Sequence, residues 1–324
     1  MSPQKSLRTP RRAAEAGFLM ALASMSTVQL GSALTVPLFG ELTAVGAAGL
    51  RLGWAGLLLL VLVRPRRRDF ARPDLLACTA LGVATAGMML FFMLAIARLP
   101  MGTASALEFL GPLAVSLYGP GAGRKTWTAA AATGVALLTE PWRGSLDLIG
   151  VGYALAAAAC WAAYILLTQR IGDRVTGLKG LAVSMPVAGA LSMLIAAPTL
   201  STHLTWPAAW TMLGLAVLSP LVPFALEFLA LRRLTSSAFG TLMSLEPAIA
   251  LLIGLAVLGQ TPGLASALGI AFVVTAGVGA TRAGARPATE HALGESGVGV
   301  GRVVAVEATT MPATRAEPQA RGTT

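Results

Sequence analysis

The chain has 324 residues, of which 55% are hydrophobic and 12% are charged. Soluble domains carry about 25% charged residues, so this composition argues against a soluble enzyme and predicts an integral membrane protein. The formal net charge of +10 does not indicate a nucleic-acid partner, because most basic residues occupy short connectors between apolar segments.

Long stretches without a charged residue predict transmembrane helices, because a helix needs roughly 20 apolar residues to cross a bilayer. These stretches cover residues 16–40, 75–97, 148–169, 180–226 and 247–281. Dividing the apolar segments at charges and at Pro and Gly clusters predicts an all-α integral membrane protein with ten spans. The spans have approximate bounds of 16–36, 43–63, 74–97, 102–119, 126–140, 148–169, 179–199, 208–231, 238–258 and 263–281.

The distribution of Lys and Arg predicts the orientation of these spans. With the N-terminus in the cytoplasm, eighteen basic residues between Lys5 and Arg286 fall on the cytoplasmic side, and the opposite connectors hold only Arg98 and Arg143. Cytoplasmic loops carry the excess of basic residues, so we expect both termini inside. Residues 1–15 would be a cytoplasmic N-terminus. Residues 282–324 lack a periodic apolar face and predict a disordered cytoplasmic tail.

An internal repeat relates the two halves of the chain. A shift of 135 positions superposes FMLAIARL at 92–99 on EFLALRRL at 227–234, and LGP at 110–112 on LEP at 245–247. Five spans is an odd number, so the copies at 16–140 and 148–281 would be inverted, as in many secondary transporters. A chance match between helices rich in Ala, Leu and Gly is the alternative. Interrupted helices in matching positions point to a binding site, and the residues expected at these interruptions are Gly111, Pro112 and Pro247.

Four Arg or Glu residues fall in the interior of predicted spans, namely Arg51, Glu108, Glu227 and Glu246. A charge at the centre of a membrane helix costs at least about 2.5 to 3.5 kcal/mol on insertion scales, so each needs a partner, a proton or water. They are therefore our candidates for substrate binding or proton coupling. A structural role is the alternative for each carboxylate, and the sequence does not decide which one pairs with Arg51.

Further polar and aromatic residues are candidates for lining a central cavity. Trp161 and Tyr164 share one face of the sixth span, and this face either points inward or packs against lipid and protein. Ser105, Thr241 and Ser244 lie near the aligned prolines and could bond a substrate hydroxyl, although such residues more often bond their own helix backbone. No metal-ligand spacing or cofactor motif is present in the sequence, so we expect neither.

Three segments carry a family resemblance: ALEFLGPLAV at 106–115, ACWAAYIL at 159–166 and FGTLMSLEPA at 239–248. Together they resemble the EamA family of the drug/metabolite transporter superfamily, and within it the threonine/homoserine exporter type, over roughly residues 16–281. The resemblance implies ten helices, amino-acid efflux across the bacterial cytoplasmic membrane and coupling to the proton gradient. One departure is Gln260, where the family usually has Glu, which weakens any role of this position in proton coupling.

We therefore expect a proton-coupled exporter of small amino acids with alternating access. Glu108 and Glu246 would bind a proton or the substrate ammonium, and Arg51 would bind its carboxylate. The expected partners are the amino acid, protons and membrane lipid, with a homodimer left open. The alternatives are a transporter of another small metabolite or an importer, and outside transport an integral-membrane enzyme or a scaffold. The sequence lacks the clustered His, Asp or Ser-base sets that such an enzyme needs.

Overall fold

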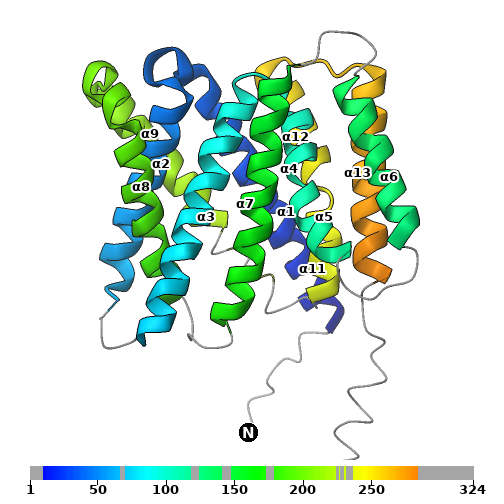
Figure 1. Cartoon of the computed structure of the whole chain (residues 1–324), viewed down its shortest axis with the longest axis horizontal. Helices are drawn as coiled ribbons and strands as arrows, with labels where there is room; N and C mark the ends of the chain where they lie inside the picture. Colours follow the sequence, from blue (N-terminus) through cyan, green and yellow to red (C-terminus); the bar gives the residue numbers. More distant parts are fainter. Residues whose placement is uncertain are drawn as a thin grey trace, which may run out of the picture. The chain divides into compact units, whose positions relative to one another are not determined.

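The computed structural model describes residues 10–65, 70–117, 124–140, 147–172, 179–223, 226, 230 and 236–283. In this part of the chain the regular structure is entirely helical, as Figure 1 shows, which confirms the predicted all-α class. The elements are α1 (Pro10–Thr35), η1 (Val36–Leu38), α2 (Phe39–Val63), α3 (Arg72–Ile96), α4 (Met101–Glu108), α5 (Leu110–Leu117), α6 (Arg124–Thr139), α7 (Leu148–Gly172), α8 (Lys179–His203), α9 (Trp206–Ala216), η4 (Val217–Leu221), α11 (Ser236–Met243), α12 (Glu246–Leu258) and α13 (Leu264–Ala283).

The structure describes only part of the two terminal segments expected at 1–15 and 282–324. Of the segment expected to precede the first span, 1–15, the structure describes residues 10–15, and these belong to α1. The tail expected at 282–324 lies outside the described residues, apart from the two residues that end α13.

Several of the described helices are long and apolar enough to cross a bilayer. Five segments qualify, and three shorter apolar helices accompany them. The first segment runs for 49 residues, from Glu15 to Val63, which is about twice the length that one crossing needs. It is divided by η1 and by Thr43, whose φ of 58° and ψ of 163° are not helical. This break coincides with the expected start of the second span.

Two helices are interrupted at positions that are related by the offset of the sequence repeat. Helix α4 ends at Glu108 and α11 ends at Met243, so the same offset of 135 positions relates the two interruptions. The predicted residues lie just after the breaks rather than at them. Gly111 and Pro112 belong to the first turn of α5, and Pro247 to the first turn of α12. Proline is tolerated there because the first N–H groups of a helix have no intrahelical acceptor.

A third interruption, at Ser219, was not predicted from the sequence. Helix α9 continues into the π-helical turn η4, and within this turn Ser219 adopts an extended backbone with φ −157° and ψ 111°. Pro220 follows and carries no N–H to continue the helical hydrogen bonds. The backbone groups around Ser219 therefore need partners from outside their own helix.

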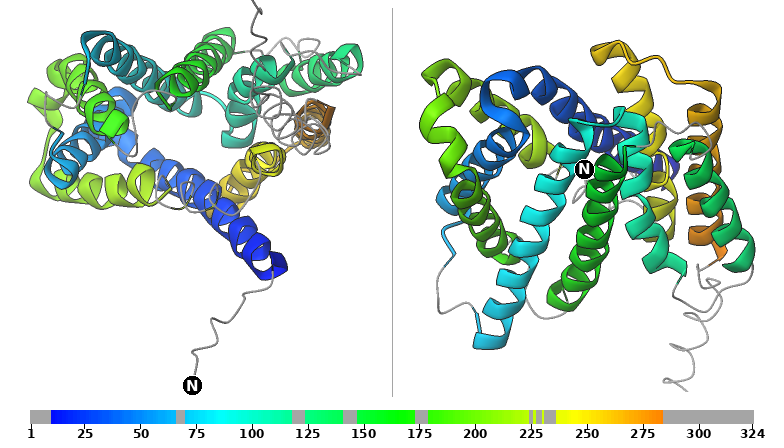
Figure 2. Two further views of the ribbon diagram at one scale, coloured as in Figure 1. Left: turned by 90° about the horizontal axis from the view of Figure 1, so that it is seen from below. Right: turned by 45° about the horizontal axis from the view of Figure 1, so that its top comes forward.

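The helices pack in pairs that join segments far apart in the sequence. Helix α2 packs along α8, α3 along α7, and α6 along α13. In Figure 2, α3 and α7 form one side of the bundle, and α1, which contacts η4, lies on the other. Glycines allow the closest approach between α2 and α8. A Cβ on Gly56 would lie 2.7 Å from the Met185 carbonyl oxygen, and one on Gly189 would lie 2.7 Å from that of Leu52.

The start of α7 is fixed by a side-chain cap. The Oδ1 atom of Asp147 accepts a hydrogen bond from the Gly150 N–H over 2.8 Å, and its Oδ2 atom lies 2.9 Å from Nε of Arg98. The Gly150 N–H and the Arg98 guanidinium hold the pKa of Asp147 below its ordinary value, because both stabilise the charged carboxylate. Asp147 thus joins the end of α3 to the beginning of α7.

Candidate functional site

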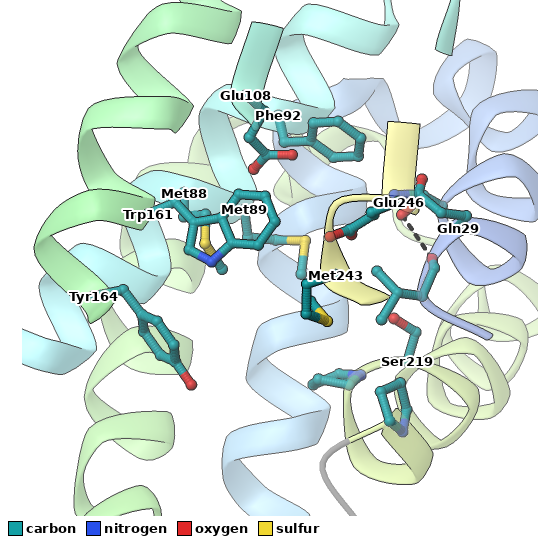
Figure 3. Close-up of a pocket in the computed structure, with 14 residues that line it drawn as sticks. Gln29, Met88, Met89, Phe92, Glu108, Trp161, Tyr164, Ser219, Met243 and Glu246 are labelled. Atoms are coloured by element: carbon teal, nitrogen blue, oxygen red, sulfur yellow. Dashed lines mark hydrogen bonds between the residues drawn. The ribbon is translucent and has the colours of Figure 1, made fainter. Parts of the chain in front are cut away.

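A cavity of about 150 Å³ lies among α1, α3, α4, α7, η4, α11 and α12. A cavity of this size has room for several water molecules. The cavity therefore suits a small solute. Figure 3 shows its wall, which is formed by Val28, Gln29, Ser32, Met88, Met89, Phe92, Glu108, Trp161, Tyr164, Ser219, Pro220, Pro223, Met243 and Glu246.

Two carboxylates from the interrupted helices share this cavity. Glu108 is the last residue of α4 and is 7% exposed, and Glu246 is the first residue of α12 and is 6% exposed. Figure 3 shows both carboxylate groups directed into the space between the walls. Glu246 accepts a hydrogen bond from Gln29 of α1. No residue in the described part of the chain donates a hydrogen bond to Glu108. The two carboxylates therefore differ in how well the protein supports their negative charge.

Gln29 connects the two helix interruptions. Its Nε2 atom donates to Oε1 of Glu246 over 3.1 Å and lies 3.4 Å from Oγ of Ser105 in α4. The side chain is 1% exposed, and within the described residues its Oε1 atom accepts no hydrogen bond. A buried acceptor without a donor costs about 1 to 3 kcal/mol, so a ligand that donates to this oxygen gains from the contact.

Arg51 lies behind the cavity wall and is fully buried. Its Nε atom donates to the Ser219 carbonyl over 2.8 Å, and its two terminal nitrogens donate to the hydroxyls of Ser219 and Ser32. Among the described residues Arg51 forms no ion pair with Glu108 or Glu246. Arg51 thus holds Ser219 and Ser32 of the wall by hydrogen bonds and does not neutralise either cavity carboxylate.

The other candidates fall into two groups. Trp161 and Tyr164 both line the cavity from α7, and the ring of Trp161 meets Phe109 edge to face at a centroid distance of 6.2 Å. Ser105 does not line the cavity itself, but it contacts Gln29, which does. Thr241 and Ser244 are not part of the wall. Glu227 lies outside the described residues.

Comparisons with known proteins support a common origin. Residues 148–281 match the EamA-like transporter family. The chain is 37% identical over 270 residues to the threonine/homoserine exporter RhtA of Salmonella typhimurium strain LT2, an alignment that covers 81% of this chain and 90% of the relative. It is 36% identical over 267 residues to the exporter of the same name from Escherichia coli K12, covering 80% and 89%. The chain belongs to the EamA-like transporter family.

This EamA protein is accordingly a multi-pass membrane transporter and not an enzyme. A solved crystal structure also resembles it, with a TM-score of 0.54 over 84% of this chain and 98% of the other. The sequence identity to that structure is 19%, so the likeness concerns the fold alone.

Sequence reasoning missed two polar residues of the EamA cavity, Gln29 and Ser219. Both lie in apolar stretches without a charged residue. A buried amide or hydroxyl is costly in an apolar environment unless it is hydrogen-bonded, so a lone Gln in such a stretch was a usable signal. The Ser-Pro pair at 219–220 was another, because proline removes a helix hydrogen bond.

Proposed function

We propose that this protein exports small amino acids of the threonine and homoserine type across the bacterial cytoplasmic membrane, by proton antiport with alternating access. One observation carries the proposal. Two buried carboxylates from two interrupted helices meet in one small cavity, in a chain that is 36 to 37% identical to threonine/homoserine exporters over about 80% of its length.

The proposed architecture has ten transmembrane helices in two inverted repeats, at 16–140 and 148–281. The matching interruptions after α4 and α11 support it, because the sequence offset that relates the repeats also relates the breaks. The packing of α2 on α8 and of α6 on α13 also supports it, since about the same offset relates the two helices of each pair. Inverted repeats of this kind place the substrate near the bilayer midplane.

The proposed orientation places the N-terminal segment 1–15 and the tail 282–324 in the cytoplasm. In Figure 1 the start of α1, the end of α2, the start of α3 and the end of α13 lie at the lower side of the bundle. The exposed residues Arg64, Arg72 and Arg282 belong to these ends. The opposite end of α3 leads into Arg98, whose charge is balanced by Asp147. This asymmetry supports a cytoplasmic lower side.

The substrate ammonium would bind between Glu108 and Glu246. A buried positive group needs an opposite charge, and both carboxylates face the same space. Gln29 adds an acceptor through its Oε1 atom. The wall is otherwise largely apolar, with methionine and aromatic side chains that pack against a small aliphatic side chain.

Proton coupling would follow from the repulsion between the two carboxylates. Two negative charges in one poorly solvated cavity destabilise each other, so either a proton or the substrate ammonium is favoured there. Glu108 lacks a hydrogen-bond donor among the described residues, whereas Glu246 has Gln29. Glu108 is therefore the carboxylate that would take the proton when the substrate leaves.

The test is transport by the purified protein in proteoliposomes. Labelled threonine or homoserine should move faster when a pH gradient is imposed, and each translocated amino acid should be accompanied by proton movement in the opposite direction. Transport of an unrelated metabolite, with no movement of either amino acid, would reject the substrate. Amino-acid flux that ignores the pH gradient would reject proton antiport.

A further inference from the structure

We infer that the hydroxyl of Ser219, held by Arg51, binds the carboxylate of the transported amino acid. The inference rests on the proposed function, because it assigns the second end of a zwitterionic substrate to the same cavity. It gives Arg51 an indirect role: the substrate touches Ser219, and Arg51 positions that residue.

The hydrogen bonds of Arg51 decide how Ser219 can act. A guanidinium has only donors, so the hydroxyl oxygens of Ser219 and Ser32 must accept from it. Ser32 directs its own proton to the Val28 carbonyl, 3.0 Å away. Ser219 has no such acceptor within the described chain. Its hydroxyl proton is therefore available to a ligand in the cavity that it lines.

Electrostatics favour an anion at this end of the cavity. The Arg51 guanidinium lies directly behind Ser219 and is fully buried, and in the described residues no carboxylate is paired with it. A positive charge acts strongly over short distances where water is excluded. Glu108 and Glu246 supply negative charge to the same cavity. A zwitterion would therefore bind with its ammonium toward the two Glu residues and its carboxylate toward Ser219.

Two features hold Ser219 in this position, its own backbone conformation and the close approach of α1. Its extended conformation breaks the helix and allows both its carbonyl and its hydroxyl to reach Arg51. On the other side, α1 passes so closely that a Cβ on Gly31 would lie 2.7 Å from the Ser219 Cβ. Figure 3 shows Ser219 on the same side of the cavity as Gln29 and Glu246, across from Trp161 and Tyr164. The hydroxyl is thus placed before the substrate arrives.

The experiment compares two ligands that differ only in the carboxylate. Exchange of labelled threonine is measured in proteoliposomes without a pH gradient, with unlabelled threonine or threonine methyl ester as competitor. The ester keeps the ammonium and the hydroxyl but has no negative charge. The variant is Ser219→Ala, and the matched control is Ser184→Ala. Ser184 is also buried, but it bonds the Leu181 carbonyl of its own helix and does not line the cavity.

We expect Ser219→Ala to weaken competition by threonine about 10-fold to 100-fold, the size of one lost hydrogen bond to a charged group. Competition by the ester should stay as in the wild type, and Ser184→Ala should change neither ligand. An unchanged threonine affinity in Ser219→Ala, or a parallel loss for both ligands, would overturn the inference. If Ser219→Ala does not insert into the membrane, Ser219→Cys replaces it, because cysteine keeps the size of the side chain with a much weaker donor. The Cys variant must then weaken competition by threonine and leave competition by the ester unchanged. A wild-type protein that exchanges neither threonine nor homoserine would instead reject the proposed function.

Discussion

The amide nitrogen of Gln29 lies 3.1 Å from Oε1 of Glu246, across 217 positions of the chain. The same nitrogen reaches the hydroxyl of Ser105 at 3.4 Å, so one side chain of α1 contacts both interrupted helices. A hydrogen bond to a carboxylate is stronger than one to a neutral acid. This contact therefore joins α1 to α12 at the cavity.

Replacement of Gln29 by Leu should slow threonine flux by about 10-fold or more, because the bond to a charged group is worth about 1.5 to 3 kcal/mol. The measurement is initial flux in proteoliposomes, normalised to the inserted protein. Thr133→Val is a suitable control, since Thr133 is exposed and bonds only the Ala129 carbonyl of its own helix. Wild-type flux in the Leu variant would contradict a role for Gln29 in organising the cavity.

Glu108→Gln and Glu246→Gln should each remove the acceleration of flux by a pH gradient, because the amide keeps the size of the side chain but cannot exchange a proton. Flux with and without the gradient is compared in the same vesicle preparation. Glu41→Gln serves as the control, since Glu41 is exposed near the start of α2. Proton coupling through these two residues is wrong if both cavity variants respond to pH like the wild type.

Arg51→Lys should lower the apparent Tm in detergent and slow export. A lysine keeps the charge but cannot donate in the planar fork that reaches both the carbonyl and the hydroxyl of Ser219. Arg51→Ala should be more severe, because it leaves the buried Ser219 carbonyl without its side-chain donor, at about 1 to 3 kcal/mol. Thermal unfolding measures the change in Tm. Release of labelled threonine and survival of cells in toxic homoserine measure the change in export.

An Arg51→Lys protein with the Tm and export rate of the wild type would show that the hydrogen bonds from Arg51 to Ser219 are dispensable. A lower Tm with normal export would restrict Arg51 to folding. Either result would leave the carboxylates of the cavity as the basis of transport.

Gly111→Ala should reduce the amount of folded protein, because the added Cβ would overlap the Ala158 carbonyl oxygen of α7. Overpacking of this kind typically costs about 1 to 3 kcal/mol. Gly152→Ala is the matched control, since nothing lies within 4 Å of its Cβ position. Fluorescence size-exclusion chromatography of both variants measures the folded fraction. Equal recovery of the two proteins would mean that α5 and α7 separate at little cost.

Cysteine labelling tests the orientation. In a protein with Cys78 and Cys160 replaced by Ala, Thr202→Cys and Gly263→Cys should react with an impermeant thiol reagent added to intact cells. Arg64→Cys and Lys125→Cys should react only after the membrane is opened. All four positions are exposed, so access to the reagent, and not burial, decides the result. The reverse pattern would place the termini outside.

Much of the fold was accessible from the sequence. The apolar stretches predicted the all-α class, and the 135-residue offset predicted interruptions near Pro112 and Pro247. The third interruption was missed, because Ser219 lies in an apolar stretch whose hydropathy alone resembles that of an unbroken helix. Trp161 and Tyr164 were candidates only if their face pointed inward, and the structure places both on the cavity wall.

The sequence by itself determined which segments are apolar, where basic residues gather and which residues are too costly to leave charged in lipid. These properties are local, because each residue meets the solvent according to its own chemistry and that of its neighbours in the helix. Only the tertiary structure decided that Arg51 bonds Ser219 across 168 positions and that Gln29 bonds Glu246. Such contacts depend on which helix faces meet when α1, α2, η4 and α12 pack together, and hydropathy along one chain carries no information on that choice.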